Sequence, residues 1–215
     1  MTQPQYFCNR FSVGLTGGIA SGKSAAATRF GELGAAIVDT DVIAHALTAP
    51  AGAAMPAISQ AFGTPFINAD GSLNRAKMRE HVFAAPTERL KLEAILHPLI
   101  ATHTKALGNT VAGAYVVFVV PLLVDVRGSA AVWQQRVNRI AVVDCAEHSQ
   151  LARLAARSNI DTAQGQRILA AQASRQARLA VANDVLLNNS TLSALTAQVD
   201  ALHQQYVAMA AQHRG

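Results

Sequence analysis

Cysteine is scarce in this sequence, and several features that would indicate a particular class of protein are missing. The two cysteines, Cys8 and Cys145, are too few for a disulfide framework and lack metal-site spacing, which indicates reduced thiols. No apolar run reaches the roughly 18 residues that a membrane helix needs, and the longest, 114–124, contains Pro121. The first ten residues lack the apolar stretch of a secretory signal. We therefore expect a cytoplasmic protein without a membrane partner.

Charge is also sparse, at 14% of the chain, and the net charge of +5 comes mainly from arginine. There is no lysine-rich tail and no basic stripe interleaved with aromatic residues, so we expect no nucleic-acid partner. Several arginines instead gather in the segment 150–183 against a single acid, Asp161. Because guanidinium groups suit phosphate oxygens, this segment is a candidate phosphate clamp, although a solvated helix face is the alternative for any one of them. They are Arg153, Arg157, Arg167, Arg175 and Arg178.

Short apolar segments alternate with helical ones along the chain. Helices are expected at 24–33, over the arginine-rich stretch 147–181, and at 192–209. Continuous apolar runs predict buried strands at 11–15, 35–38, 115–120, 137–143 and 184–187. This alternation predicts an α/β fold with a doubly wound, parallel, five-stranded sheet.

The segment 42–113 is helical in character and too long for an ordinary crossover between two strands. It is expected to form a helical substrate-side insertion. Breaks are expected at Pro50, Pro56, the turn 68–71, Pro86 and Pro98.

The segment GGIASGKS, residues 17–24, satisfies the pattern G-x-x-x-x-G-K-[ST] between a predicted strand and a predicted helix, which makes the fold P-loop NTPase-like. Its glycines let successive N–H groups curve around an anion at the positive end of the helix. Lys23 can then reach the β- and γ-phosphates, and the Ser24 hydroxyl can bind Mg²⁺ as the metal ligand. The predicted nucleotide-binding residues are Gly17, Gly18, Ile19, Ala20, Ser21, Gly22, Lys23, Ser24 and Ala25.

Asp39 and Asp41 follow the second predicted strand, where α/β sheets present ligand-binding groups. One of these carboxylates can accept the proton of an attacking hydroxyl group, and the alternative is that both are turn or helix-capping residues. Asp144 ends the fourth predicted strand just before a helix, so we expect it at the start of that helix. The guanine-recognition pattern Asn-Lys-x-Asp is absent, which disfavours a GTPase.

Several separated blocks together resemble the dephospho-coenzyme A kinase family over nearly the whole chain. They are GLTGGIASGKS, IVDTDVIAH, FGTPFINADGSLNRAKMREHVF, LHPLI, VVPLLVD, VVDCAEHSQLARLAARS and QASRQARLAVANDVLLNNS. The resemblance implies phosphorylation of the ribose 3′-hydroxyl of dephospho-coenzyme A, with ATP as donor and Mg²⁺ as cofactor, giving coenzyme A and ADP. Asp41 occupies the position of the family's proposed catalytic base.

The resemblance also implies a division of the chain into three parts. The nucleotide-binding core would comprise 11–41, 114–146 and 184–215, the coenzyme A side would be 42–113, and the lid with its following helix would be 147–183. Arg153 and Arg157 would reach the phosphates when the lid closes and excludes water. Asn188 would lie near the adenine. The expected acceptor-binding residues are Asp41, Arg75, Arg79, His97, Pro121 and Leu122. Alternatively, Arg75 and Arg79 lie on a solvated helix face. The alternative for His97 is a structural role at a helix end.

Four residues depart from the usual pattern of the family. Asn183 and Ser190 replace an acid and a glycine near the segment expected at the adenine. Ala20 replaces a glycine and is expected to require a negative φ, and Ala25 replaces a threonine. Other interpretations stay open: a P-loop kinase for nucleosides, nucleoside monophosphates or shikimate-like acids, a nucleotide-dependent switch or ATPase, and an inactive nucleotide-binding protein. The assembly is expected to be a monomer or a small homo-oligomer.

Overall fold

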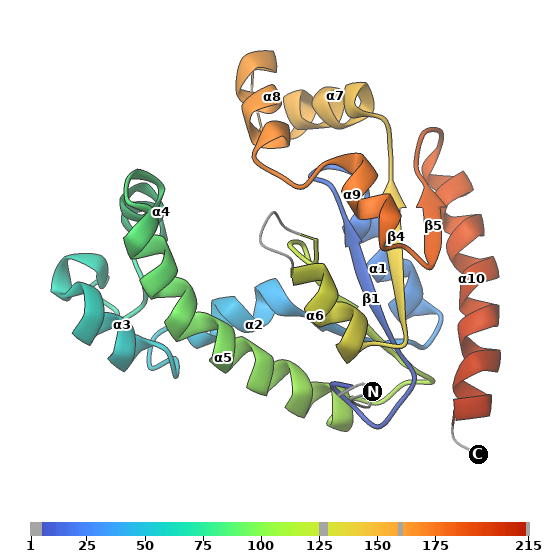
Figure 1. Cartoon of the computed structure of the whole chain (residues 1–215), viewed down its shortest axis with the longest axis horizontal. Helices are drawn as coiled ribbons and strands as arrows, with labels where there is room; N and C mark the ends of the chain where they lie inside the picture. Colours follow the sequence, from blue (N-terminus) through green and yellow to red (C-terminus); the bar gives the residue numbers. More distant parts are fainter. Residues whose placement is uncertain (1–5, 125–128, 159–160, 214–215) are drawn as a thin grey trace. The chain divides into compact units, whose positions relative to one another are not determined.

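A single five-stranded sheet organises the fold. The computed structural model describes residues 6–124, 129–158 and 161–213, without the side chains of residues 157 and 158 (Figure 1). β1 pairs in parallel with both β3 and β4, and β4 pairs in parallel with β5. The sheet order is β2-β3-β1-β4-β5, formed by Ala36–Asp39, Val116–Val119, Ser12–Gly17, Arg139–Asp144 and Asp184–Leu187. The predicted α/β fold and strand positions are thereby confirmed.

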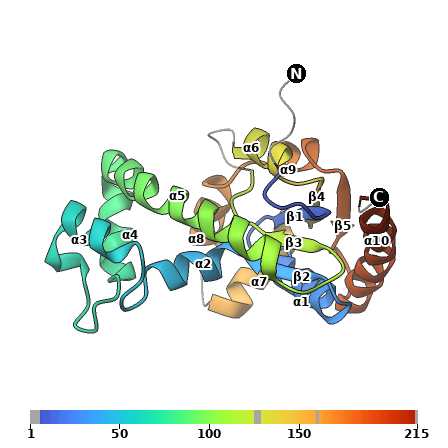
Figure 2. The same cartoon turned by 90° about the horizontal axis from the view of Figure 1, so that it is seen from below.

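Helices cover both faces of this sheet, which explains why the strand sequences are continuously apolar (Figure 2). On one face lie α1 (Lys23–Glu32) and α10 (Leu192–His213), and the buried rings of Phe30 and Tyr206 stack between them. On the other lie α6 (Ser129–Arg136) and α9 (Arg175–Ala180). Trp133 of α6 packs against Phe118 of β3.

The arginine-rich stretch forms three helices rather than one continuous helical run. α7 spans Glu147–Ser158, α8 spans Thr162–Ala170, and α9 follows after a short turn. Asp161 caps the start of α8 by accepting a hydrogen bond from the Gln164 amide, and Ser174 caps α9 in the same way. α6 had not been predicted, because its segment has mixed polarity.

The chain divides into two compact units, one made of residues up to Val38 and from Leu107 onward, the other of Asp39–Ala106. The second unit contains a short 3₁₀ turn, Thr64–Phe66, and helical segments throughout. Its helices are α2 (Thr40–Leu47), α3 (Met55–Phe62), α4 (Arg75–Ala84) and most of α5 (Pro86–Thr110).

Pro98 does not break a helix, so that prediction is wrong. It lies inside α5, whereas Pro56 and Pro86 lie at helix starts, where a missing N–H group costs nothing. Pro98 is exposed, so water can bind the carbonyl group that loses its helical partner.

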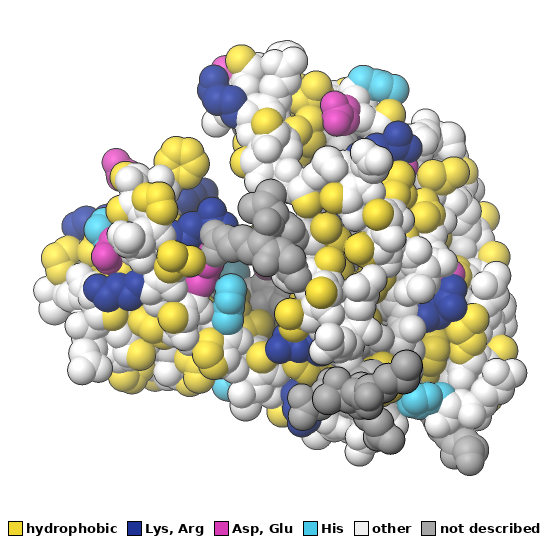
Figure 3. Space-filling model, in the orientation of Figure 1, with side chains coloured by type: hydrophobic (Ala, Val, Ile, Leu, Met, Phe, Trp, Pro, Cys, Tyr) yellow, Lys and Arg dark blue, Asp and Glu magenta, His cyan; other side chains and the backbone are white. Residues whose placement is uncertain are grey.

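The distribution of basic side chains and the lengths of the helices bear on whether nucleic acid or a membrane could be a partner. On the face drawn in Figure 3, the Lys and Arg side chains lie in separate small groups rather than in one stripe. No helix within the described ranges has the length and apolar character needed to cross a membrane.

Candidate active site

The glycine-rich loop joins β1 to α1, and its shape depends on residues without side chains. Gly22 has a φ of 101°, a left-handed conformation that favours glycine. A Cβ atom placed on Gly18 would lie 2.4 Å from Gln150 Nε2 and 2.9 Å from Arg178 Nη2. The φ of Gly22 therefore favours glycine, whereas the atoms nearest Gly18 are the ends of flexible side chains that can move.

Ala20 also has a positive φ, of 55°, so the expectation of a negative value is wrong. An L-residue pays roughly 1–2 kcal/mol for this conformation. The surrounding hydrogen bonds hold the loop in this shape: Arg153 Nη1 donates to Ala20 O at 3.2 Å. Backbone strain thus lies within the predicted nucleotide-binding loop, where such strain tends to be functional.

Three side chains from distant segments bind the carbonyl oxygens of the loop. Gln150 Nε2 donates to Ile19 O at 2.6 Å, and Asn188 Nδ2 donates to Ser21 O at 2.7 Å. Arg153 adds its bond to Ala20 O and a longer one, 3.4 Å, to Ser21 O. These donors bind carbonyl groups, which cannot bind an anion, and so do not occupy the N–H groups of the loop. The Ile19 and Ser21 amides have other acceptors, Gln172 Oε1 and Gly18 O.

The N–H groups and the start of α1 fit a phosphate. The first helical hydrogen bond runs from the Ala26 amide to Gly22 O, and no described side chain caps this helix end. Its unpaired amides and positive dipole end favour an anion. Lys23 is the first residue of α1, and no described residue forms an ion pair with it. The Ser24 side chain is exposed and Ala25 is half-buried.

Two buried hydroxyl groups lie in the same region without a partner among the described residues. They are Thr16 Oγ1 at the end of β1 and Ser21 Oγ within the loop. Unpaired buried polar atoms are costly in a completed site. Their presence fits a loop whose hydrogen bonding is completed by a bound polar group or water.

The arginines of the predicted phosphate clamp have different contacts in the structure. Arg153 Nη2 also donates to Asn188 O at 2.9 Å, so this guanidinium group joins three backbone carbonyl groups. Arg178 is buried beside Gly18, and burial lowers the pKa of its guanidinium group. The Arg157 side chain lies outside the described residues.

Asp144 does not have the predicted role at a helix start. Its buried carboxylate accepts three bonds from Arg175, two from Nε at 2.8 and 3.1 Å and one from Nη2 at 2.7 Å, and this contact raises the pKa of Arg175. Near the start of α7, the Ala146 amide is instead bound by Asn189 Oδ1. The expectation is wrong because a guanidinium group from α9 is available to pair with this otherwise isolated buried charge.

Asp39 and Asp41 lie at the end of β2 and the start of α2. Asp39 is the N-cap of α2, and its Oδ1 accepts the Asp41 amide at 2.8 Å. The capping interpretation therefore holds for Asp39. The exposed Asp41 lies in the first turn of α2, where a carboxylate is favoured by the helix dipole.

The remaining predicted acceptor residues occupy two regions. Arg75 lies on α4 and donates to Thr48 Oγ1 and His45 O, so it ties α4 to the end of α2. Arg79 on α4 and His97 on α5 are exposed. Pro121 and Leu122 follow β3 after Val120, and Leu122 is 58% exposed.

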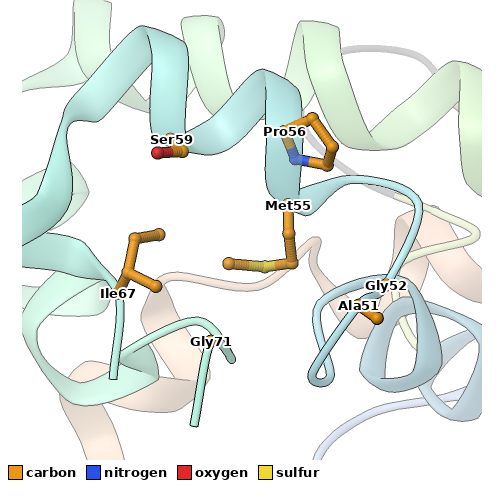
Figure 4. A pocket seen from close by; sticks show the side chains of 7 residues that line it. All are labelled: Ala51, Gly52, Met55, Pro56, Ser59, Ile67 and Gly71. Carbon is orange, nitrogen blue, oxygen red and sulfur yellow. The ribbon is translucent and has the colours of Figure 1, made fainter. Parts of the chain in front are cut away.

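A pocket of about 310 Å³ lies within the helical unit (Figure 4). The Met55 side chain of α3 and the Ile67 side chain border the hollow, so its lining is mainly apolar. None of the predicted site residues lines it. Its lining residues are Ala51, Gly52, Met55, Pro56, Ser59, Ile67 and Gly71.

Two loop-binding residues were missed by sequence reasoning, Gln150 and Gln172. Gln172 Oε1 accepts the Ile19 amide at 3.0 Å, and Gln150 binds the carbonyl group of the same residue. The sequence held one signal: Gln150 precedes Arg153 by three residues in a predicted helix, so both lie on one face. Within the described ranges, no group of three or more His, Cys, Asp or Glu residues could hold a metal ion.

Comparisons with known proteins identify relatives along most of the chain. The family model described as dephospho-CoA kinase matches residues 11–194. A protein from Burkholderia pseudomallei strain K96243, named dephospho-CoA kinase, is 55% identical over 205 residues, which cover 95% of this chain and 99% of the relative. A protein of the same name from Thiobacillus denitrificans is 54% identical over 201 residues, covering 94% and 98%.

Solved structures share the fold at lower sequence identity. TT1252 from Thermus thermophilus has a TM-score of 0.77 at 23% identity, over 91% of this chain and 97% of that one. A shikimate kinase from Acinetobacter baumannii has a TM-score of 0.52 at 16% identity, covering 93% and 94%. The fold is therefore shared with a kinase that is named for a different acceptor. For this reason the fold by itself does not identify the molecule that receives the phosphate.

Proposed function

The chain belongs to the dephospho-CoA kinase family, and from this premise we propose that it transfers the terminal phosphate of ATP to the ribose 3′-hydroxyl of dephospho-CoA. The family match over residues 11–194 is the observation that carries this proposal. The phosphate loop agrees with it, because its carbonyl groups are bound by side chains and the amides at the start of α1 are uncapped.

On the nucleotide side, the loop amides and Lys23 bind the phosphates and hold the donor in place. Ser24 is the residue that would hold Mg²⁺, which supplies positive charge to the phosphates when bound. Asn188 supports the loop by donating to Ser21 O, and we propose that it also lies near the adenine.

On the acceptor side, Asp41 is the proposed general base. The ribose 3′-oxygen forms a bond to the terminal phosphorus while the bond to the bridging oxygen breaks, and ADP leaves. Asp41 takes the proton that the hydroxyl group loses. Arg79 and His97 are proposed to bind the acceptor, with Pro121 and Leu122 after β3, whereas Arg75 contributes mainly by tying α4 to α2.

We propose the segment 147–183 as a lid that limits hydrolysis by excluding water. Arg153 and Arg157 are its proposed phosphate-facing cations. In the conformation described, Arg153 holds the loop through Ala20 O and Ser21 O, so its first contribution is to keep the loop shaped for phosphate.

The deciding experiment measures ADP release from MgATP by the purified chain, with and without dephospho-CoA. The expected result is ADP release that depends on the acceptor, together with a product that carries a new 3′-phosphate. Parallel reactions with shikimate, nucleosides and nucleoside monophosphates test the other kinase classes. ADP release at the same rate with and without dephospho-CoA would contradict the proposal.

A further inference from the structure

The pocket of the helical unit lies just beyond the end of α2. Ala51 and Gly52 form part of its wall, three and four residues after Thr48, which is the C-cap of α2. Gly52 packs directly on α2, because a Cβ atom placed on it would lie 2.3 Å from Leu47 O. One wall of the pocket is therefore attached to the helix that carries Asp41 in its first turn.

The other walls suit an uncharged, flexible chain. Met55 and Ile67 face one another across the hollow, and Ser59 lies one turn after Met55 on α3 (Figure 4). Methionine adapts to irregular shapes, and a serine hydroxyl group can bond an amide. None of the described residues that line the pocket carries a charge. The volume of about 310 Å³ is small for a ligand pocket, so it suits part of a larger molecule.

A cation lies between Asp41 and this pocket. Arg75 donates to Thr48 Oγ1 and to His45 O at the end of α2. Both acceptors are neutral, and no carboxylate among the described residues forms an ion pair with Arg75. A helix rises about 1.5 Å per residue, so Thr48 lies roughly 10 Å from Asp41 along α2. The charge of Arg75 is therefore held beyond the proposed base, on the way to the pocket.

Dephospho-CoA carries matching groups in the same order. The ribose hydroxyl that reacts is followed by the diphosphate and then by the pantetheine arm, an uncharged chain with two methyl groups, two amides and a terminal thiol. A carboxylate base, a cation and an apolar pocket follow one another along α2 and the loop after it. A guanidinium group pairs well with phosphate oxygens, and an apolar wall favours methyl and methylene groups.

We propose that the pocket beside α3 binds part of the pantetheine arm of the acceptor and that Arg75 faces its diphosphate. This inference rests on the proposed function and adds to it a basis for acceptor selection. Nucleosides and nucleoside monophosphates lack the arm, so they gain no affinity from the pocket. A hollow left only by imperfect packing would not distinguish these acceptors.

The test fills the pocket and measures kcat and KM of the full chain for dephospho-CoA at saturating MgATP. Ser59→Phe places a ring at an exposed position of α3, where folding should be preserved. The KM for dephospho-CoA should rise about tenfold, equivalent to about 1.4 kcal/mol, while kcat and the KM for ATP stay nearly constant. Gln60→Phe is the control, because Gln60 is also exposed on α3 but does not line the pocket. Its KM for dephospho-CoA should equal that of the parent chain.

Two fragments of the acceptor locate the effect. Adenosine 5′-monophosphate keeps the adenosine half, and 4′-phosphopantetheine keeps the arm with one phosphate. Both are measured as competitive inhibitors against dephospho-CoA. Ser59→Phe should weaken inhibition by 4′-phosphopantetheine about tenfold and leave inhibition by adenosine 5′-monophosphate unchanged. Equal weakening of both would show a general disturbance of the acceptor site and overturn the assignment of the pocket.

A chemical modification after folding keeps the test valid if Ser59→Phe is unstable. Ser59→Cys changes one atom, and N-ethylmaleimide then enlarges this side chain in the folded chain. Cys8 and Cys145 are buried, and the parent chain treated in the same way corrects for their reaction. The KM for dephospho-CoA should rise only after alkylation. An unchanged KM in the alkylated chain would overturn the inference, whereas a parent chain that transfers no phosphate to dephospho-CoA would overturn the proposed function itself.

Discussion

At the scale of single residues, Asp41 and Asp39 provide a matched pair of carboxylates. Asp41→Asn keeps the shape of the side chain but removes its capacity to take a proton. Turnover should fall by about 10²- to 10⁴-fold, the usual contribution of a general base. The dissociation constant of MgATP should change little, because the phosphates are bound by the loop and Lys23.

Asp39→Asn is the control for this prediction. Asparagine caps a helix about as well as aspartate, so the bond to the Asp41 amide should persist. ADP release in the presence of dephospho-CoA would be measured for both variants, together with MgATP affinity. Equal turnover of Asp41→Asn and the parent chain would remove Asp41 from the mechanism.

Ala20 leads to a prediction about stability. Glycine at this position would avoid the cost of the left-handed conformation but add flexibility to the unfolded chain. The expected gain is about 0.5–1 kcal/mol in the free energy of unfolding, because the two terms partly offset each other. Denaturant titration measures it. Ala51→Gly, at a φ of 59° in the helical unit, should give a gain of similar sign. A less stable Ala20→Gly chain would show that the strain is not relieved.

At the scale of elements, α10 is joined to the sheet by buried polar contacts as well as by apolar packing. His203 Nδ1 lies 3.0 Å from Tyr115 Oη of the segment leading into β3, and Tyr206 Oη donates to Asp184 of β5 at 2.7 Å. Burial raises the pKa of both phenol groups and lowers the pKa of His203, while the nearby Asp200 opposes that decrease. The last helix is thus attached by groups that must stay neutral.

This attachment predicts a loss of stability below neutral pH. Burial lowers the pKa of His203 in the folded chain, so it takes up its proton at a lower pH than in the unfolded chain, whose ordinary pKa is about 6.5. The unfolded state therefore binds more protons as the pH falls from 7.5 to 5.5, and the free energy of unfolding decreases. His203→Gln should flatten this dependence, measured by denaturant titration, and the exposed His148→Gln should not. The same slope in both variants would contradict the prediction.

At the scale of the whole molecule, the chain assigns its proposed tasks to two units. The phosphate loop and its supporting side chains belong to the unit that contains the sheet, and Asp41, Arg79 and His97 belong to Asp39–Ala106. Kinetic constants for donor and acceptor should therefore respond to different substitutions.

Arg79→Ala tests this division. Loss of an arginine that contacts an anionic acceptor should raise the KM for dephospho-CoA roughly tenfold, since hydrogen bonds to charged groups are the stronger kind. The KM for ATP should stay unchanged. Arg89→Ala is the control, because Arg89 is exposed and pairs with Glu93 on its own helix. A rise in the KM for ATP alone would place Arg79 on the donor side.

Local pattern was enough to predict much of this protein. The strands, the first and last helices and the phosphate loop depend on contiguous residues, namely apolar runs, glycines and Lys23-Ser24. The family resemblance is likewise read from ordered blocks of sequence. Such features follow from local conformational preference and burial, so they can be recognised along the chain without knowing what packs against them.

Tertiary structure decided which side chains complete the loop. Gln150 and Gln172 reach Ile19 from 131 and 153 residues away, and Arg175 reaches Asp144 from the next layer of helices. The left-handed conformation of Ala20 and the continuity of α5 through Pro98 also belong to this level. The physical reason is that a backbone donor, acceptor or buried charge is satisfied by whichever group the folded arrangement brings near, and no local spacing records that partner.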